Sequence, residues 1–277
     1  MTIKEKLIWF YLNSLLYIYV SSVTVIIPYK NNLEFLYLAL NSVFFQTYKK
    51  FKILIVYDDE DRSDLYYIKK FKNKSKIKKK YSIEIILNKK NLGAGESRNI
   101  GIKNCKSKYI AFLDSDDVWH KNKLKLQLEI MHKHKVPISH TSYNIINESG
   151  KKISLRKCKK IIIFKDILGS CNIGLSTVII NKNFLKKNNF KFPKIKTKED
   201  YVLWLRILKR IPFIMGIDKN LTNYRKRKHS LSSNIFVNLI NGYKVYKDYL
   251  NMGYIESIYR LIVLSINYLK KTYFIKN

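Results

Sequence analysis

The chain has 277 residues, of which 47% are hydrophobic and 14% aromatic, so it can bury a large core and is not a disordered protein. Its 54 lysines and arginines outnumber 20 aspartates and glutamates, which gives a net charge of +34. This charge suits nucleic acid, an anionic membrane surface or phosphorylated ligands, and it equally suits a genome whose base composition favours Lys, Asn and Ile codons.

The first 22 residues form an apolar N-terminal extension. Leu7–Val20 is almost continuously apolar but short for a membrane span. Lys4 and Lys6 resemble the basic start of a signal peptide, although Tyr19-Val20-Ser21 is a poor cleavage site. We therefore predict an interfacial helix or a helix packed on the protein surface.

Strands and helices alternate from Val23 onward. Helical spacing of apolar residues predicts helices over Leu33–Gln46 and Glu96–Cys105. Apolar, β-branched runs predict buried strands at 23–28, 51–56, 83–87 and 109–113. This alternation predicts an α/β fold with a mainly parallel central sheet and helices on both faces. Ligands of such sheets bind beyond the carboxyl ends of the strands, so the loops that follow these four strands should converge on one site.

The second half of the chain is less regular. Its patterns predict helices over Asn122–Met131 and Tyr201–Leu208, and strands over His140–Ile146 and Ser176–Ile180. From Ile235 onward we expect a helical tail. The predicted domains are an apolar extension over 1–22, a main domain over 23–233 and a helical C-terminal extension over 234–277.

Two clusters of carboxylates directly follow predicted strands. Asp58 and Asp59 come after the second strand, and Asp114, Asp116 and Asp117 come after the fourth. We expect the two clusters to lie at the ends of neighbouring strands, where only a cation would relieve their repulsion. A hard divalent cation, Mn²⁺ or Mg²⁺, would bind such oxygens and share them with substrate phosphates. Either cluster alone could instead be a solvated turn with helix-capping aspartates.

Five groups of motifs resemble, in order and at similar spacing, those of the family 2 glycosyltransferases with the GT-A fold. One such motif is weak evidence, whereas five in order are specific. The match covers roughly residues 23–233, and the first 22 residues have no counterpart. The matching segments are Thr24–Asn31 with Leu40–Tyr48 and Ile55–Asp59, then Asn91–Gly93 with Arg98–Gly101, then Tyr109–Asp117, then Glu199–Arg206, and finally Tyr224–Arg225 with His229, Ser230 and Ser232.

This resemblance implies transfer of a sugar from a nucleotide-diphosphate sugar, such as a UDP-sugar, to a hydroxyl of a saccharide or lipid-linked acceptor in surface polysaccharide biosynthesis. One base and one metal ion imply a single displacement with inversion, because a double displacement needs a nucleophilic carboxylate. The implied donor-binding residues are Pro28, Tyr29, Asp58, Asp59, Arg98 and Asp114; the implied metal ligands are Asp116, Asp117 and His229; and the implied catalytic base is Asp200.

Alternatives remain open for Asp200 and for the function. Glu199 and Asp200 also suit the first turn of a helix, whose dipole favours carboxylates. Gly93-Ala94-Gly95 resembles the fingerprint of a dinucleotide-dependent oxidoreductase, but Arg98 occupies its third glycine position. The charge suits a non-enzymatic protein that binds nucleic acid or a membrane. Because the aspartate clusters would repel phosphates without a metal, we expect no nucleic-acid partner.

Several features predict a cytoplasmic protein at the inner face of the cell membrane. Nucleotide sugars are cytoplasmic, and the three cysteines lack a C-x-x-C pair, as expected for reduced thiols. Leu7–Val20 and Tyr254–Leu269, which ends in Lys270-Lys271, could each lie in the membrane interface without spanning it. The alternative is that both segments pack on the main domain.

Overall fold

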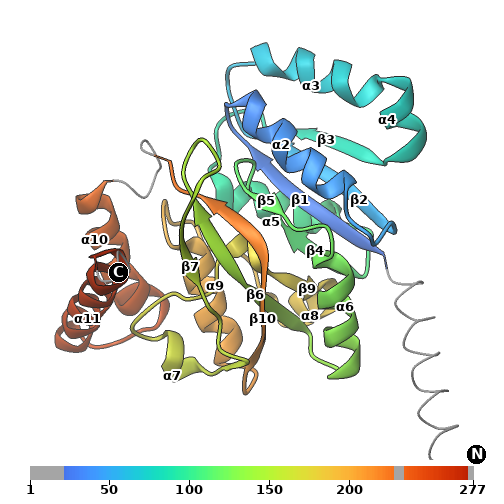
Figure 1. The fold of residues 1–277 in the computed structure, drawn as a ribbon. Coiled ribbons are helices and arrows are strands. Elements are labelled where there is room, and N and C mark those ends of the chain that lie inside the picture. Colours follow the sequence, from blue (N-terminus) through green and yellow to red (C-terminus); the bar gives the residue numbers. More distant parts are fainter. Residues whose placement is uncertain (1–21, 228–233, 274–277) are drawn as a thin grey trace, which may run out of the picture.

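The computed structural model describes residues 22–227 and 234–273 (Figure 1). A single sheet runs through the described chain in the order β3-β2-β1-β4-β9-β6-β10-β5, with β7 paired to β6 and β8 to β10. The strands are β1 (Val23–Tyr29), β2 (Phe51–Tyr57), β3 (Ile83–Leu87), β4 (Tyr109–Phe112), β5 (Val118–Trp119), β6 (Ile138–Ile146), β7 (Lys152–Arg156), β8 (Ile161–Ile162), β9 (Ile179–Asn181) and β10 (Ile214–Arg225). The helices are α2 (Leu33–Phe44), α3 (Ser63–Asn73), α4 (Ser75–Lys80), α5 (Ala94–Asn104), α6 (Lys123–Lys133), α7 (Phe164–Ile167), α8 (Lys182–Lys187), α9 (Glu199–Leu208), α10 (Ile235–Lys244) and α11 (Tyr254–Tyr273).

The first four strands form the parallel half of the sheet. β1 lies in the middle, where Val25 is in register with Ile53 of β2 on one side and Ala111 of β4 on the other. β3 pairs in parallel with the outer side of β2. The long strand β10 also runs parallel to β6, whereas shorter strands such as β9 join antiparallel. The predicted α/β fold with a mainly parallel central sheet is therefore confirmed.

Helices cover both faces of this sheet. Successive side chains of a strand point to opposite faces. Val25 of β1 accordingly belongs to a core cluster with Leu36 of α2 and Leu128 of α6, whereas Ile26 belongs to a second cluster that includes Trp204 of α9. Burial on both faces explains why the strands appear in the sequence as continuous apolar runs.

The segment predicted as one strand over Ser176–Ile180 is divided. Leu175–Thr177 forms a 3₁₀ turn, and β9 begins only at Ile179. The polar atoms of Ser176 bind other elements instead of a strand ladder. Its hydroxyl accepts a hydrogen bond from the Asp114 amide (3.0 Å), and its carbonyl accepts one from Trp119 Nε1 (2.8 Å). The serine thereby anchors the loop that carries the second aspartate cluster.

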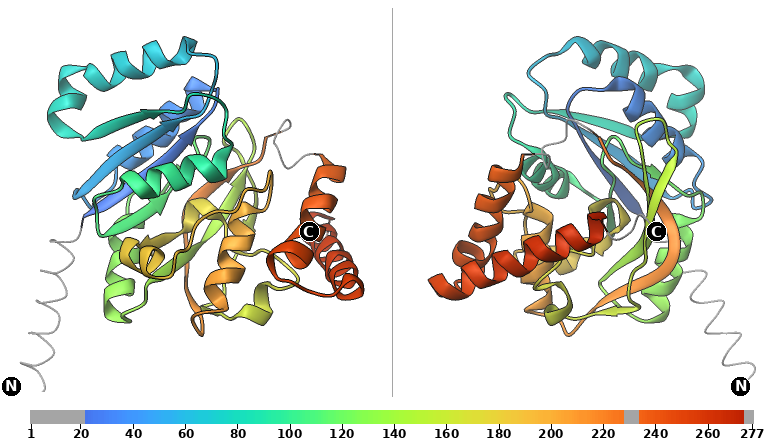
Figure 2. Two further views of the ribbon diagram at one scale, coloured as in Figure 1. Left: turned by 180° about the vertical axis from the view of Figure 1, so that it is seen from behind. Right: turned by 60° about the vertical axis from the view of Figure 1, so that its left-hand side comes forward.

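The C-terminal part of the chain is helical, as expected, with one interruption. α10 continues into a π-helical turn over Val245–Tyr249, and α11 begins at Tyr254. Val245 and Tyr246 are fully buried in the same core cluster as α9. Figure 2 shows α10 and α11 beside the sheet, on the side away from α3 and α4. None of the helices in the described ranges is long and apolar enough to cross a membrane, and Leu7–Val20 lies outside those ranges.

Candidate active site

The loops that follow β2 and β3 are tied together by the carboxylate of Asp58. This side chain is only 3% exposed and accepts three hydrogen bonds. The donors are the side-chain amide of Asn88 (2.7 Å) and the backbone amides of Leu92 and Gly93 (both 2.8 Å). Asp58 therefore supports the loop through which the chain enters α5, consistent with the supporting role that the motif implied.

The other residues predicted for the nucleotide pocket surround the same strand ends. Asp59 is half-buried and accepts hydrogen bonds from the backbone amides of Asn31 (3.1 Å) and Asp61 (3.3 Å). Pro28 and Tyr29 are buried within β1, and the Tyr29 hydroxyl donates to Asp64. Burial and the Asp64 carboxylate raise the pKa of Tyr29. The contacts of Pro28, Tyr29 and Asp59 with a nucleotide-sugar donor remain predictions.

The two aspartate clusters are not at the ends of neighbouring strands, and that expectation was wrong. β1 lies between β2, which Asp58 and Asp59 follow, and β4, which Asp114 follows. β1 pairs in parallel with both β2 and β4, and the strand patterns in the sequence do not record which strands are neighbours. Asp58 and Asp59 accept hydrogen bonds from neighbouring amide groups, so no cation shared with the second cluster is needed to explain their burial.

Arg98 of α5 links the end of β4 to the start of α9. Its Nη2 lies 2.7 Å from Asp114 Oδ1, and its Nη1 lies 2.7 Å from Glu199 Oε1. The guanidinium is buried and also lies 5.5 Å from the ring centroid of Phe192. Two carboxylates offset the cost of burying this cation. The motif implied a place near the donor phosphates for Arg98, whereas the ion pair with Glu199 was not foreseen.

Asp200 lies beside this ion pair in the first turn of α9. Its Oδ1 accepts a hydrogen bond from the Tyr201 amide (2.7 Å). Burial and the neighbouring Glu199 charge raise the pKa of Asp200 to about 7, against the opposing effect of Arg98. A carboxylate with a pKa near neutrality can be ionised and still basic enough to take a proton from a hydroxyl group. The position therefore suits a general base.

Asp116 and Asp117 form a second acidic group beyond β4. Asp117 is fully buried, and its Oδ1 accepts a hydrogen bond from the Arg225 amide (2.8 Å). Burial and the charges of Asp116 and Asp114 raise the pKa of Asp117 well above its usual value. Burial and Asp114 likewise raise the pKa of Asp116 to about 6, although Arg227 Nη1 lies 3.8 Å away. These carboxylates repel one another without enough cationic compensation.

This donor set fits a divalent cation that also binds a ligand. Among the described residues, no group of three His, Cys, Asp or Glu side chains is placed to hold a metal ion unaided, and His229 lies outside them. Mg²⁺ and similar ions commonly take one or two carboxylates and complete their shell with substrate phosphates and water. Asp116, whose side chain is 24% exposed, and its neighbour Asp117 could supply these ligands.

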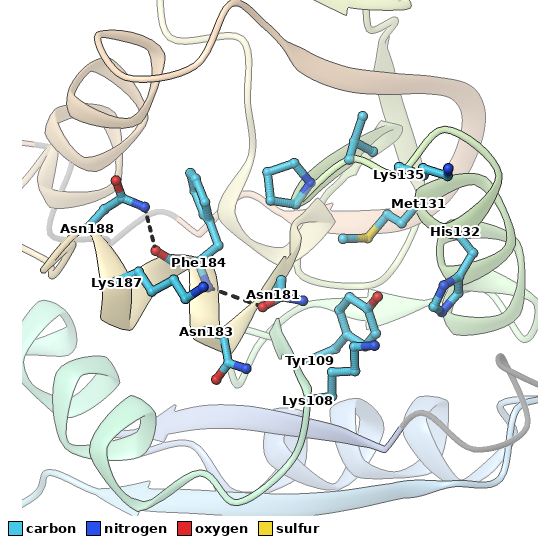
Figure 3. A pocket seen from close by; sticks show the side chains of 12 residues that line it. Lys108, Tyr109, Met131, His132, Lys135, Asn181, Asn183, Phe184, Lys187 and Asn188 are labelled. Carbon is cyan, nitrogen blue, oxygen red and sulfur yellow. Dashed lines mark hydrogen bonds between the residues drawn. The ribbon is translucent and has the colours of Figure 1, made fainter.

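An open hollow of about 490 Å³ lies elsewhere, at the opposite end of β4 (Figure 3). Lys108 and Tyr109 at the start of that strand line it, together with residues of α6 and α8 such as Met131 and Lys187. Its lining includes none of the predicted site residues in the described part of the chain. The hollow is therefore separate from the carboxylate site, which follows the carboxyl end of the strand.

Comparison with known proteins places these features in a family. Residues 24–201 match the model of glycosyl transferase family 2. An uncharacterised glycosyltransferase of Rickettsia conorii is 37% identical over 207 residues, which are 74% of this chain and 33% of that protein. This chain thus spans about a third of the length of that relative.

A second relative matches along nearly its whole length. The Escherichia coli protein WfgD, named a UDP-Glc:alpha-D-GlcNAc-diphosphoundecaprenol beta-1,3-glucosyltransferase, is 32% identical over 267 residues, covering 92% of this chain and 97% of WfgD. Among solved structures, TarS 1-349 of S. aureus in complex with UDP-GlcNAc is similar in fold, with a TM-score of 0.68, 21% identity and coverage of 90% of this chain and 73% of TarS 1-349. The expected GT-A fold is therefore confirmed.

Proposed function

Because this chain belongs to glycosyl transferase family 2, we propose that it transfers a sugar from a UDP-sugar to a hydroxyl of a lipid-linked saccharide acceptor, with inversion and with the help of Mn²⁺ or Mg²⁺. The substrates named for WfgD and the nucleotide sugar bound to TarS support this choice of donor and acceptor classes. The products of such a reaction would serve surface polysaccharide biosynthesis.

The arrangement around Arg98 carries the proposal. Its contacts with Asp114 and Glu199 fix the end of β4 relative to the helix that bears Asp200. In the proposed reaction the acceptor oxygen attacks the anomeric carbon, Asp200 takes the hydroxyl proton, and the bond to the diphosphate breaks. A divalent ion at Asp116 and Asp117, with His229 as a third candidate ligand, would supply stabilisation of the charge that develops on the leaving diphosphate.

The remaining donor-binding residues have roles in binding and not in chemistry. We propose that Asp59 contacts the nucleotide base, that Pro28 and Tyr29 form part of its pocket, and that Asp58 holds the surrounding loops. We also propose that the enzyme is cytoplasmic and rests on the inner face of the membrane, where nucleotide sugars meet lipid-linked acceptors. The predicted division at residues 22 and 233 remains part of this proposal.

A thermal-shift screen of nucleotides with and without Mn²⁺ tests the donor and the metal. We expect stabilisation by UDP and UDP-sugars that depends on Mn²⁺, equivalent to about 3 kcal/mol when ligand is a hundredfold above its dissociation constant. Asp116→Asn should lose the metal-dependent part, whereas Asp248→Asn, an exposed carboxylate in the π-helical turn, should keep it. Equal stabilisation without metal would contradict the metal site, and stabilisation by NAD would favour an oxidoreductase.

A further inference from the structure

One side of α11 exposes an apolar stripe. Ile255 is 84% exposed, and Tyr259 and Ile262 are 58% and 51% exposed. The α11 apolar stripe, as we define it, consists of Ile255, Ile258, Tyr259, Ile262, Ile266 and Leu269. Its members recur every three or four residues along a helix of 20 residues, so they share one face. Such a continuous apolar face is more than the scattered exposure that soluble surfaces normally show.

The opposite side of α11 packs on the body of the protein. Leu264 contacts the core cluster that contains α9. Asn267 Nδ2 donates to the Gly169 carbonyl (3.0 Å), and Lys271 Nζ donates to Ser170 and Asn172. The loop and the helix pack closely at Gly169, where an added Cβ atom would lie 3.0 Å from Val263 Cγ1. The helix is thus held in place by one face while its stripe points away from the core.

The loop that α11 holds lies next to the proposed base. Cys171 belongs to that loop. Burial and the nearby negative charge of Asp200 together raise the pKa of its thiol to about 12. Tyr201, the neighbour of Asp200, donates to the carbonyl of Ile167 at the start of the same segment (2.7 Å). Asn241 of α10 also binds the side chain of Thr197, just before α9 (3.0 Å). The C-terminal helices therefore flank the start of α9, which carries Asp200.

We propose that the α11 apolar stripe docks on an anionic lipid bilayer, with α11 lying in the plane of the interface. Isoleucine, leucine and tyrosine side chains suit the boundary between headgroups and acyl chains, and the exposed Lys270 lies in the last turn of the helix. This inference rests on the proposal that the acceptor is a lipid-linked saccharide. Docking of α11 would then hold the loop beside Asp200 at the membrane surface, close to such an acceptor.

Charge favours a lipid surface over a second copy of this chain. The chain carries a net charge of +34, so two identical copies repel each other on average. Anionic lipid attracts the same charge, and each basic residue near the surface strengthens binding. α11 itself carries Arg260 and Lys270 against the single acid Glu256, while Lys271 is bound to Ser170 and Asn172 on the packed face. An anionic bilayer would therefore bury the α11 apolar stripe and also attract the basic residues of the helix.

Sedimentation of the full-length protein with vesicles tests the proposal. The probes are vesicles of phosphatidylcholine alone and of phosphatidylcholine mixed with phosphatidylglycerol. We expect binding to the mixed vesicles, and we expect Ile255→Ser/Tyr259→Ser to lower the partition coefficient about tenfold or more, since two exposed apolar side chains lose their burial in lipid. Both side chains are exposed, so the melting temperature should not change.

A matched control replaces two exposed aromatic residues of α3. Tyr66→Ser/Tyr67→Ser removes side chains that are 63% and 52% exposed and should bind vesicles like the unsubstituted protein. Equal binding by the α11 variant and the unsubstituted protein, or no binding by either, would overturn the proposal. A dimer that dissociates in the α11 variant and does not bind vesicles would show instead that the stripe is a protein interface. UDP-dependent thermal shifts should be the same in all variants, so failure of docking can be told apart from failure of the proposed function.

Discussion

At the scale of single residues, the ionisation of Asp200 connects the structure to the proposed chemistry. Burial of the Asp200 carboxylate and the negative charge of Glu199 disfavour its ionised form, whereas the positive charge of Arg98 favours that form. The folded protein therefore binds a proton at Asp200 more readily than the unfolded chain does. The resulting destabilisation is absent below the ordinary carboxylate pKa, grows as the pH rises toward about 7, and is complete above that value.

Replacing Asp200 by asparagine separates catalysis from folding. We expect Asp200→Asn to lower turnover by about 10²–10⁴-fold, because the general base is lost, while UDP and metal binding survive. The melting temperature should rise above pH 7 and should not rise near pH 4, since only the charged carboxylate is penalised. Turnover assays and calorimetry at the two pH values measure both effects. Normal activity with a lowered melting temperature would mean that Asp200 only supports the start of the helix.

The pH profile of activity should depend on Glu199. In the unsubstituted protein, kcat/KM should fall as the pH drops through about 7, because Asp200 becomes protonated. Glu199→Gln removes a negative charge that raises the pKa of Asp200, so the acidic limb should move to lower pH by about one unit. Asp248→Asn, an exposed change outside the site, serves as the control. A limb that stays in place in Glu199→Gln would show that another group titrates.

At the scale of elements, the position of α5 depends on a close approach to β1. A Cβ atom at Gly101 would lie 2.6 Å from Ile26 Cγ2, too close for any side chain without movement. Gly101 is therefore the point of contact between helix and strand. Because Arg98 lies one turn earlier on the same helix, this contact also sets where its guanidinium meets Asp114 and Glu199.

Gly101→Ala should reveal this contact. We expect a loss of about 1–3 kcal/mol in the free energy of unfolding, because overpacking outweighs the better helix propensity of alanine. Gly253→Ala is the control, since a Cβ atom there meets nothing within 4 Å. Urea unfolding of both variants, and of Ile26→Ala/Gly101→Ala, measures the effect. A double variant that loses the full sum of the two single losses would argue against direct contact.

At the scale of the whole molecule, the large positive charge acts on stability as well as on partners. A net charge of +34 makes the compact state repel itself, and dissolved salt screens that repulsion. Asp114, Asp116 and Asp117 are a local exception, because their negative charges lie close together and raise the pKa of both Asp116 and Asp117.

Salt should therefore stabilise the protein. We expect the melting temperature to rise when sodium chloride is increased from low concentration to about 0.1 M and beyond, as the screening length falls to about 10 Å. A neutral osmolyte at equal osmolality is the control for effects unrelated to charge. A melting temperature that falls with salt would indicate that ion pairs such as Arg98 with Asp114 outweigh the general repulsion.

The residue pattern alone predicts the four strands of the parallel half and the motifs that follow them. Period and β-branched composition are local properties, so the four strands from Val23 to Phe112 and the helices α2 and α5 could be placed within a few residues, whereas α3 and α4 were not predicted. The aspartates after β2 and β4 were found in the same way. The family resemblance supplied roles for these residues, including Asp200, that their spacing alone would not have favoured.

Which of these residues contact one another depends on how the strands and helices pack in the folded protein. The insertion of β1 between β2 and β4 separates the two aspartate clusters, and no local pattern records that order. Arg98 and Glu199 are 101 residues apart along the chain, yet their ion pair sets the environment of Asp200. The same holds for α11, whose apolar stretch suited either the membrane interface or packing on the main domain and did not show which residues the protein would leave exposed. Contacts between distant segments depend on the packing of the whole sheet, which the sequence specifies only through the sum of many local preferences.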